Sequence, residues 1–215
     1  MPREIYYLFL ILVYSTVPPF SLNFVMKKIY KEKDKSAWHT FYFYKYLITL
    51  SFLPILFLPG VDLGLAPKWS YSLPILLLII LCAVFFYRYA KREKVAQFYI
   101  GGVHAAFMEE ILYRGIIFGL AKAIWGNEWI ALAVSSLLFG AWHLKNFPWL
   151  GSRGTTWQFL YTAFYAGPLL CLLRIVAGDL YLSIFVHFMM DTTVALAPEW
   201  LRKTGLIYSP KPVDI

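Results

Sequence analysis

Residues 108–115 read Met-Glu-Glu-Ile-Leu-Tyr-Arg-Gly, which places Glu109, Glu110 and Arg114 inside an apolar run from Phe98 to Trp125. A charged side chain in the hydrocarbon of a bilayer costs at least about 2.5–3.5 kcal/mol on insertion scales. Such groups face a protein interior or a water-filled cavity, where they pair with one another or take part in function. The stretch therefore predicts a polar site within apolar helices.

The composition of the whole chain indicates a membrane protein. Of its 215 residues, 60% are hydrophobic and only 15% are charged, whereas soluble domains are about half apolar and a quarter charged. Runs of about 20 apolar residues have the length that crosses a bilayer as a helix. We therefore expect an all-α, polytopic membrane helical bundle, with residues 1–215 forming one membrane-embedded domain. The expected helices, about seven, are residues 4–26, 38–58, 71–90, 97–124, 128–145, 156–177 and 179–197, with loops or a tail at 59–70, 146–155 and 198–215.

The lysines and arginines alternate between the loops. They are concentrated after the first, third, fifth and seventh expected helices, for example at residues 27–35 and 88–94, and Lys145 and Arg153 are counted as the charges of the fifth loop. Cytoplasmic loops carry an excess of such residues, so we expect the N-terminus outside and the C-terminus in the cytosol. The net charge of +8 is thereby interpreted as a topology signal, and no nucleic-acid partner is expected.

Two further apolar segments carry ionisable groups at helical spacing. The fifth contains Phe139 and His143, and the seventh contains His187 and Asp191. Residues four apart share a helix face, so Glu110 can pair with Arg114 and His187 with Asp191. On the expected topology, these groups meet in the middle-to-cytosolic part of the bundle. We expect a cavity there that opens to the cytosol.

This set of side chains is suited to peptide hydrolysis. A glutamate with a nearby histidine, Glu109 with His143, can hold and deprotonate a water molecule, and a second histidine can donate to the developing oxyanion. A metal site of His143, His187 and a carboxylate is the alternative. The His-Glu-x-x-His helix of zinc proteases is absent from the sequence, so no cofactor is expected, although a divalent metal stays open.

Other polar residues of the apolar segments are interpreted more simply. His104 is expected to line the pocket or to be structural. Tyr113, Phe139 and Trp142 are assigned to packing, as are the two cysteines, Cys82 and Cys171.

The motifs Glu109-Glu110-x-x-x-Arg114, Phe139-x-x-x-His143 and His187-x-x-x-Asp191 resemble the three motifs of the CPBP family, the CAAX-protease and bacteriocin-processing (Abi) intramembrane proteases. The resemblance covers about residues 98–195, the expected catalytic core. It implies that Glu109 and His143 activate water, that His187 and Asp191 form the oxyanion site, and that Glu110 and Arg114 support it. The eukaryotic prenyl-protease members typically have Asn where this chain has Asp191, and an ionised Asp cannot donate to an oxyanion.

The resemblance implies a glutamate-dependent intramembrane endopeptidase of a prokaryotic plasma membrane. Its substrate would be a membrane-associated peptide, lipidated or with a C-terminal anchor, and its other partner is membrane lipid. Three alternatives stay open: a CAAX prenyl endopeptidase proper, a non-proteolytic bacteriocin immunity or scaffold protein, and a proton-coupled transporter.

Overall fold

The computed structural model describes residues 2–34, 36–68, 70–89 and 102–196, and all regular elements in these ranges are helical. The predicted all-α class is therefore confirmed. The elements are α1 (Arg3–Tyr30), α2 (Ala37–Leu50), η1 (Leu53–Phe57), α3 (Ser72–Tyr89), α5 (Ala105–Glu110), η3 (Ile111–Ile117), α6 (Phe118–Trp125), α7 (Glu128–Trp142), η4 (His143–Asn146), α8 (Phe147–Tyr161), η5 (Thr162–Ala166), α9 (Gly167–Ala177) and α10 (Tyr181–Leu196).

The surface of this bundle suits lipid. Within the described residues, three stretches are long and apolar enough to cross a membrane, namely Arg3–Tyr30, Thr40–Phe57 and Glu128–Ala177. Large apolar side chains also lie on the outside; Phe20 and Val176 are 76% and 81% exposed, as expected for groups that face lipid tails. The chain is an integral membrane protein, whereas the count of seven spans and the orientation stay predictions.

The predicted helix ends agree with the structure within a few residues, but the expected helix 38–58 is divided into α2 and η1, and a larger difference follows His143. Asn127 caps α7 by accepting hydrogen bonds from the backbone of Trp129 and Ile130, as the sequence Asn-Glu allows. The predicted loop at residues 146–155 is wrong, because α8 begins at Phe147 and is only broken within, at Gly151 (φ 68°, ψ −177°). Pro148, the second residue of α8, is compatible with the first turn of a helix. The start of the fourth predicted helix and the tail at 198–215 lie outside the described residues.

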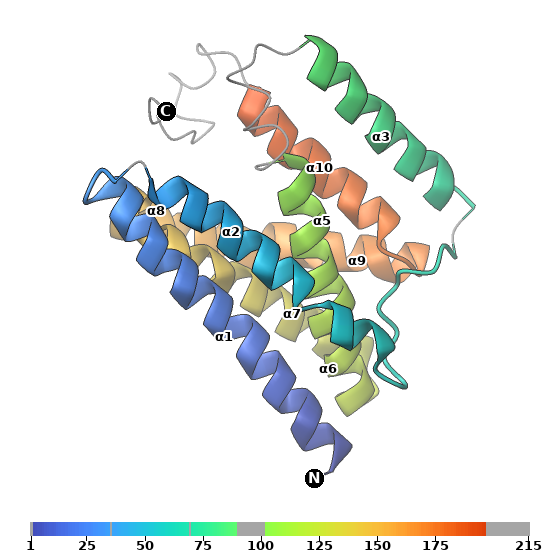
Figure 1. The fold of residues 1–215 in the computed structure, drawn as a ribbon. Helices are drawn as coiled ribbons and strands as arrows, with labels where there is room; N and C mark the ends of the chain where they lie inside the picture. The colour runs from blue at the N-terminus through green and yellow to red at the C-terminus, as the bar shows by residue number, and fades with distance from the viewer. Residues whose placement is uncertain (1, 35, 69, 90–101, 197–215) are drawn as a thin grey trace.

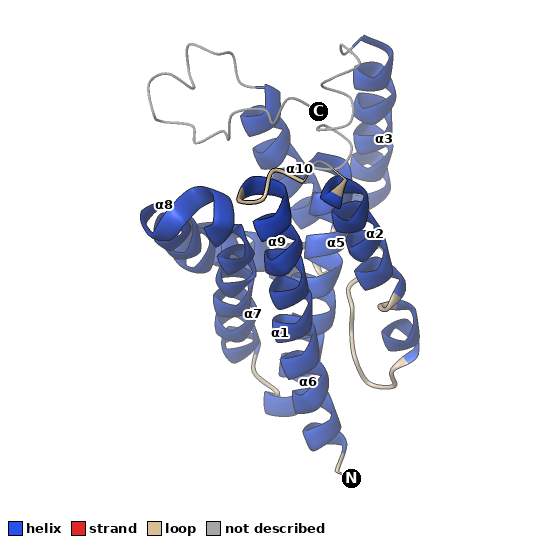
Figure 2. Cartoon of the chain, turned by 60° about the vertical axis from the view of Figure 1, so that its left-hand side comes forward, coloured by secondary structure: helices blue, strands red, loops and turns tan. Residues whose placement is uncertain are grey.

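The arrangement of the helices brings the three sequence motifs together. Helix α10 packs against α5, α9 and α3, and α7 packs against α6 and α9. Figure 1 shows α5 (green) beside α10 (orange), and Figure 2 shows α1 running along the bundle. Helix α1 contacts α2, α7 and η4. Helix α9, which packs against both α7 and α10, therefore connects two of the helices that carry the motifs, and α10 itself contacts the third, α5.

The loop between η1 and α3 fixes the start of α10. Asp179 accepts hydrogen bonds from the Lys68 backbone (2.8 Å) and from Ser72 Oγ (2.5 Å). The backbone N–H of Leu180 donates to the Gly64 carbonyl (2.9 Å). These bonds hold the first turn of α10, the helix that carries His187 and Asp191.

Candidate active site

The two glutamates lie where the helix changes its winding. Glu109 and Glu110 end α5, and Arg114 lies in the π-helical segment η3. π-helical segments are rare and are frequently found at functional sites. The exposed fractions of Glu109, Glu110 and Arg114 are 6%, 0% and 0%. All three ionisable groups are therefore buried, as predicted.

Arg114, Glu110 and His187 form a connected chain of polar contacts. Arg114 Nη1 lies 2.9 Å from Glu110 Oε1, which confirms the predicted pair, and the same oxygen accepts from His187 Nδ1 at 2.7 Å. Arg114 also donates through Nη2 to the Gly167 carbonyl (3.2 Å), and its guanidinium lies 4.1 Å from the centre of the Phe139 ring. Because the carboxylate can only accept, Nδ1 of His187 carries the hydrogen of this bond.

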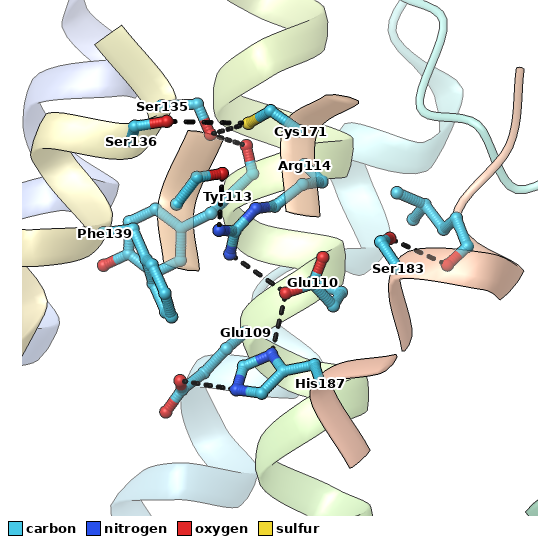
Figure 3. Close-up of polar contacts among 12 residues, drawn as sticks. Glu109, Glu110, Tyr113, Arg114, Ser135, Ser136, Phe139, Cys171, Ser183 and His187 are labelled. Carbon is cyan, nitrogen blue, oxygen red and sulfur yellow. Dashed lines mark hydrogen bonds and ion pairs between the residues drawn. The ribbon is translucent and has the colours of Figure 1, made fainter. Parts of the chain in front are cut away.

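The other nitrogen of His187 faces two further carboxylates. Nε2 lies 3.8 Å from Glu109 Oε2 and 3.5 Å from Asp191 Oδ2. Figure 3 shows the imidazole of His187 between Glu109 and Glu110, with Arg114 on the far side of Glu110. The structure thus brings together the predicted i, i+4 pair of α10 and both glutamates. A histidine bonded at Nδ1 is held with its ring in one orientation, so Nε2 points towards Glu109.

Glu109 is held by a residue that sequence reasoning assigned to packing alone. The indole Nε1 of Trp142 donates to Glu109 Oε1 at 2.8 Å, while the Trp142 side chain is fully buried. One carboxylate oxygen of Glu109 is thereby fixed, and the second faces His187. A buried indole N–H usually finds an acceptor. A tryptophan inside an apolar helix, next to His143, was therefore the sequence feature that could have predicted a hydrogen bond to a polar group of the site.

His143 begins η4 directly after α7. Its Nδ1 lies 2.9 Å from the Phe139 carbonyl, and a carbonyl only accepts, so Nδ1 carries the hydrogen and Nε2 keeps its lone pair. His143 acts electrostatically on Glu109, yet no ion pair joins them within 4.0 Å in the described part of the chain. The two side chains therefore interact through their charges without forming an ion pair.

Two buried lysines border the same site. Lys45 of α2 and Lys145 of η4 are each 6% exposed, and both act electrostatically on Glu109 and Asp191. The interpretation of Lys145 as a loop charge is wrong, because the chain stays helical there and the side chain turns inward. Its Nζ lies 3.9 Å from the centre of the Trp142 ring.

His104 lies beside the site rather than in its hydrogen-bonded chain. Its Nε2 is 3.4 Å from Thr49 Oγ1, and its ring is 5.1 Å from that of Tyr46. Among the residues that the structure describes, no group of three His, Cys, Asp or Glu side chains is arranged to hold a metal ion. Both cysteines are free thiols.

Comparison with known proteins finds a family match over the segment that contains this site. A family model described as type II CAAX prenyl endopeptidase Rce1-like matches residues 90–193. This range contains all three motifs, from Glu109 to Asp191, and the predicted resemblance to the CAAX-protease family is confirmed over it. No curated protein and no solved structure matches the chain.

Proposed function

We propose that this chain, whose residues 90–193 match the Rce1-like family of type II CAAX prenyl endopeptidases, hydrolyses a peptide bond with water activated by Glu109 and His143. The observation that carries the proposal is the environment of Glu109. Trp142 holds one of its oxygens, His187 faces the other, and His143 stands nearby with a free Nε2 lone pair. A water molecule between Glu109 and His143 would have two groups able to accept its protons.

The reaction then proceeds by addition and elimination. Glu109 takes a proton from the water, whose oxygen forms a bond to the carbonyl carbon of the peptide. The electron pair of the C=O bond moves to the carbonyl oxygen, where N–H donors stabilise it. When the C=O bond reforms, the C–N bond breaks and Glu109 returns the proton to the leaving nitrogen. One water molecule is consumed, and an acid and an amine are formed.

His187 is the proposed donor to the oxyanion. With both ring nitrogens protonated, it donates Nδ1–H to Glu110 and Nε2–H to the carbonyl oxygen. Asp191, 3.5 Å from Nε2, cannot donate when ionised, and it is proposed to orient His187. Glu110 and Arg114 are positioning residues that hold the imidazole from its other side.

The proposed substrate is a peptide of a membrane-associated protein, lipidated or with a C-terminal membrane anchor, and no metal is required. Purified protein in liposomes would be incubated with peptides carrying a prenyl group or a transmembrane anchor, and the products identified by mass. We expect cleavage at one bond that persists in EDTA and 1,10-phenanthroline. Failure to cleave any peptide would oppose the proposal, and loss of cleavage that Zn²⁺ restores would show a metal enzyme. The relative rates with the two anchors decide whether prenylation is needed.

Replacing Trp142 by Phe is expected to lower kcat about 10- to 100-fold, because a hydrogen bond to a charged group contributes about 1.5–3 kcal/mol. Phe keeps most of the packing against Tyr113 but cannot donate to Glu109. Thermal unfolding and cleavage rate would be measured together, with Trp157→Phe, at a side chain 65% exposed, as the matched control. An unchanged kcat in Trp142→Phe would contradict the positioning of Glu109 by the indole.

A further inference from the structure

Lys45 and Lys145 are two buried cations that the proposed chemistry does not use. They come from segments far apart in the sequence, α2 and η4, yet both act electrostatically on Glu109 and Asp191. An ammonium group in a low-dielectric interior is costly unless it is paired and hydrogen-bonded. Two buried ammonium groups near the same carboxylates are therefore expected to have an anionic partner.

The partners of these lysines in the protein are weak. Lys145 Nζ lies 3.4 Å from the Trp142 carbonyl and over the Trp142 ring, and Lys45 Nζ is 5.5 Å from the centre of the Phe41 ring. Over the described ranges, neither lysine has a carboxylate oxygen within 4.0 Å, whereas the buried Arg114 has Glu110 at 2.9 Å. An ammonium group offers three donors, so each lysine keeps hydrogen-bonding capacity for a further acceptor.

Lys145 also lies close to the residues proposed to activate water. It is two residues after His143, and it lies over the same indole that donates to Glu109. The η4 turn that carries both residues is held from α1, since Asn23 Nδ2 donates to the Lys145 carbonyl at 3.1 Å. A group bound by Lys145 would therefore have a fixed position relative to Glu109.

The charges of the site explain why a peptide would need such a group. Glu109, Glu110 and Asp191 surround His187 within 4.0 Å, and they would repel an anionic substrate. Two buried lysines with unused donors, which also act electrostatically on each other, offset this repulsion. The anions that a peptide carries are its C-terminal carboxylate and its Asp or Glu side chains.

We propose that Lys45 and Lys145 form a subsite that binds a carboxylate of the peptide substrate and thereby sets the distance from that carboxylate to the cleaved bond. The subsite rests on the proposed protease function, because it assigns these lysines to the same substrate. The lysines determine specificity, and they take no part in proton transfer.

The test compares matched peptides that share one transmembrane anchor and one sequence. One ends in a free acid and its twin in an amide; a second pair differs by Glu or Gln on the C-terminal side of the cleaved bond. We expect the wild-type protein to prefer one acid over its neutral twin by about 10- to 100-fold in kcat/KM, mainly through KM, because hydrogen bonds between charged groups are strong. The preferred pair identifies the source of the carboxylate.

The variants are Lys45→Met, Lys145→Met and the double variant, with Lys122→Met as the control at a half-exposed lysine that pairs with Glu128. In the double variant, the ratio of kcat/KM for the acid peptide to that for its neutral twin should fall to about one, with cleavage of the neutral twin largely retained. Lys122→Met should leave this ratio unchanged. Equal cleavage of both twins by the wild type would overturn the subsite while leaving the protease intact. An equal loss on both twins in the lysine variants would also overturn it, because the lysines would then act through Glu109.

A binding measurement keeps the proposal testable without turnover. Fluorescent acid and amide peptides would be titrated onto Glu109→Gln and onto Glu109→Gln combined with both lysine substitutions. A preference for the acid that disappears with the lysines supports the subsite even if no peptide is cleaved. Equal affinities for acid and amide would overturn it.

Discussion

Glu109→Gln is expected to lower kcat by about 10²- to 10⁴-fold, the range that general acid–base catalysis contributes, while the protein stays folded. Glutamine has nearly the shape of glutamate, and its carbonyl oxygen can still accept the 2.8 Å hydrogen bond from Trp142. Its amide cannot take a proton from water. Single-turnover cleavage in liposomes would measure the chemical step directly.

The adjacent glutamate provides the matched control. Glu110 makes its contacts with Arg114 and His187, so Glu110→Gln should act mainly on stability and on the position of His187. We expect Glu109→Gln to unfold at nearly the wild-type temperature and Glu110→Gln to unfold earlier. A cleavage rate of Glu109→Gln within about threefold of the wild type would remove Glu109 from the role of base.

Arg114→Leu is expected to destabilise the protein by about 3–5 kcal/mol, because it leaves a buried carboxylate without its cation. Glu110 is fully buried, and Arg114 additionally holds the Gly167 carbonyl of α9 at 3.2 Å. Reversible unfolding in detergent or lipid would measure the loss. The double variant Glu110→Gln/Arg114→Leu should recover part of it, because no unpaired charge then remains.

The double-mutant cycle separates this explanation from lost packing. If the guanidinium served only to fill space against Phe139, 4.1 Å from its ring centre, the two substitutions would add. Contacting charged residues instead show an interaction energy of about 0.5–3 kcal/mol. Strict additivity would therefore contradict a stabilising ion pair at this position.

The contacts within single helices were predictable from the sequence. Spacing of four residues put Glu110 beside Arg114 and His187 near Asp191, and the structure has both pairs. The expectation that the three motifs meet also agrees with the contacts of His187 with both glutamates and with the Phe139 ring. These predictions depend on helical periodicity and on the cost of buried charge, which the sequence carries locally.

The contacts between helices were not predictable in the same way. That Trp142 donates to Glu109, and that Lys145 turns inward, depends on how α7 continues into η4 and α8. Glycines and a proline in residues 146–155 suggested a loop, but in the structure only Gly151 departs from helical backbone angles. Tertiary packing here overrides local propensity, and Lys145 was counted as a loop charge for that reason.

A mass measurement during a single turnover tests most directly whether a water molecule is the nucleophile. Protein in excess over a membrane-anchored peptide would react in H₂¹⁸O, and acid-quenched samples would be analysed for product and for intact protein. We expect one ¹⁸O atom in the new carboxylate and no gain in protein mass at any time, because water attacks the peptide itself. A transient protein species heavier by the acyl fragment of the peptide would contradict it, since a side chain of the protein would then be the nucleophile.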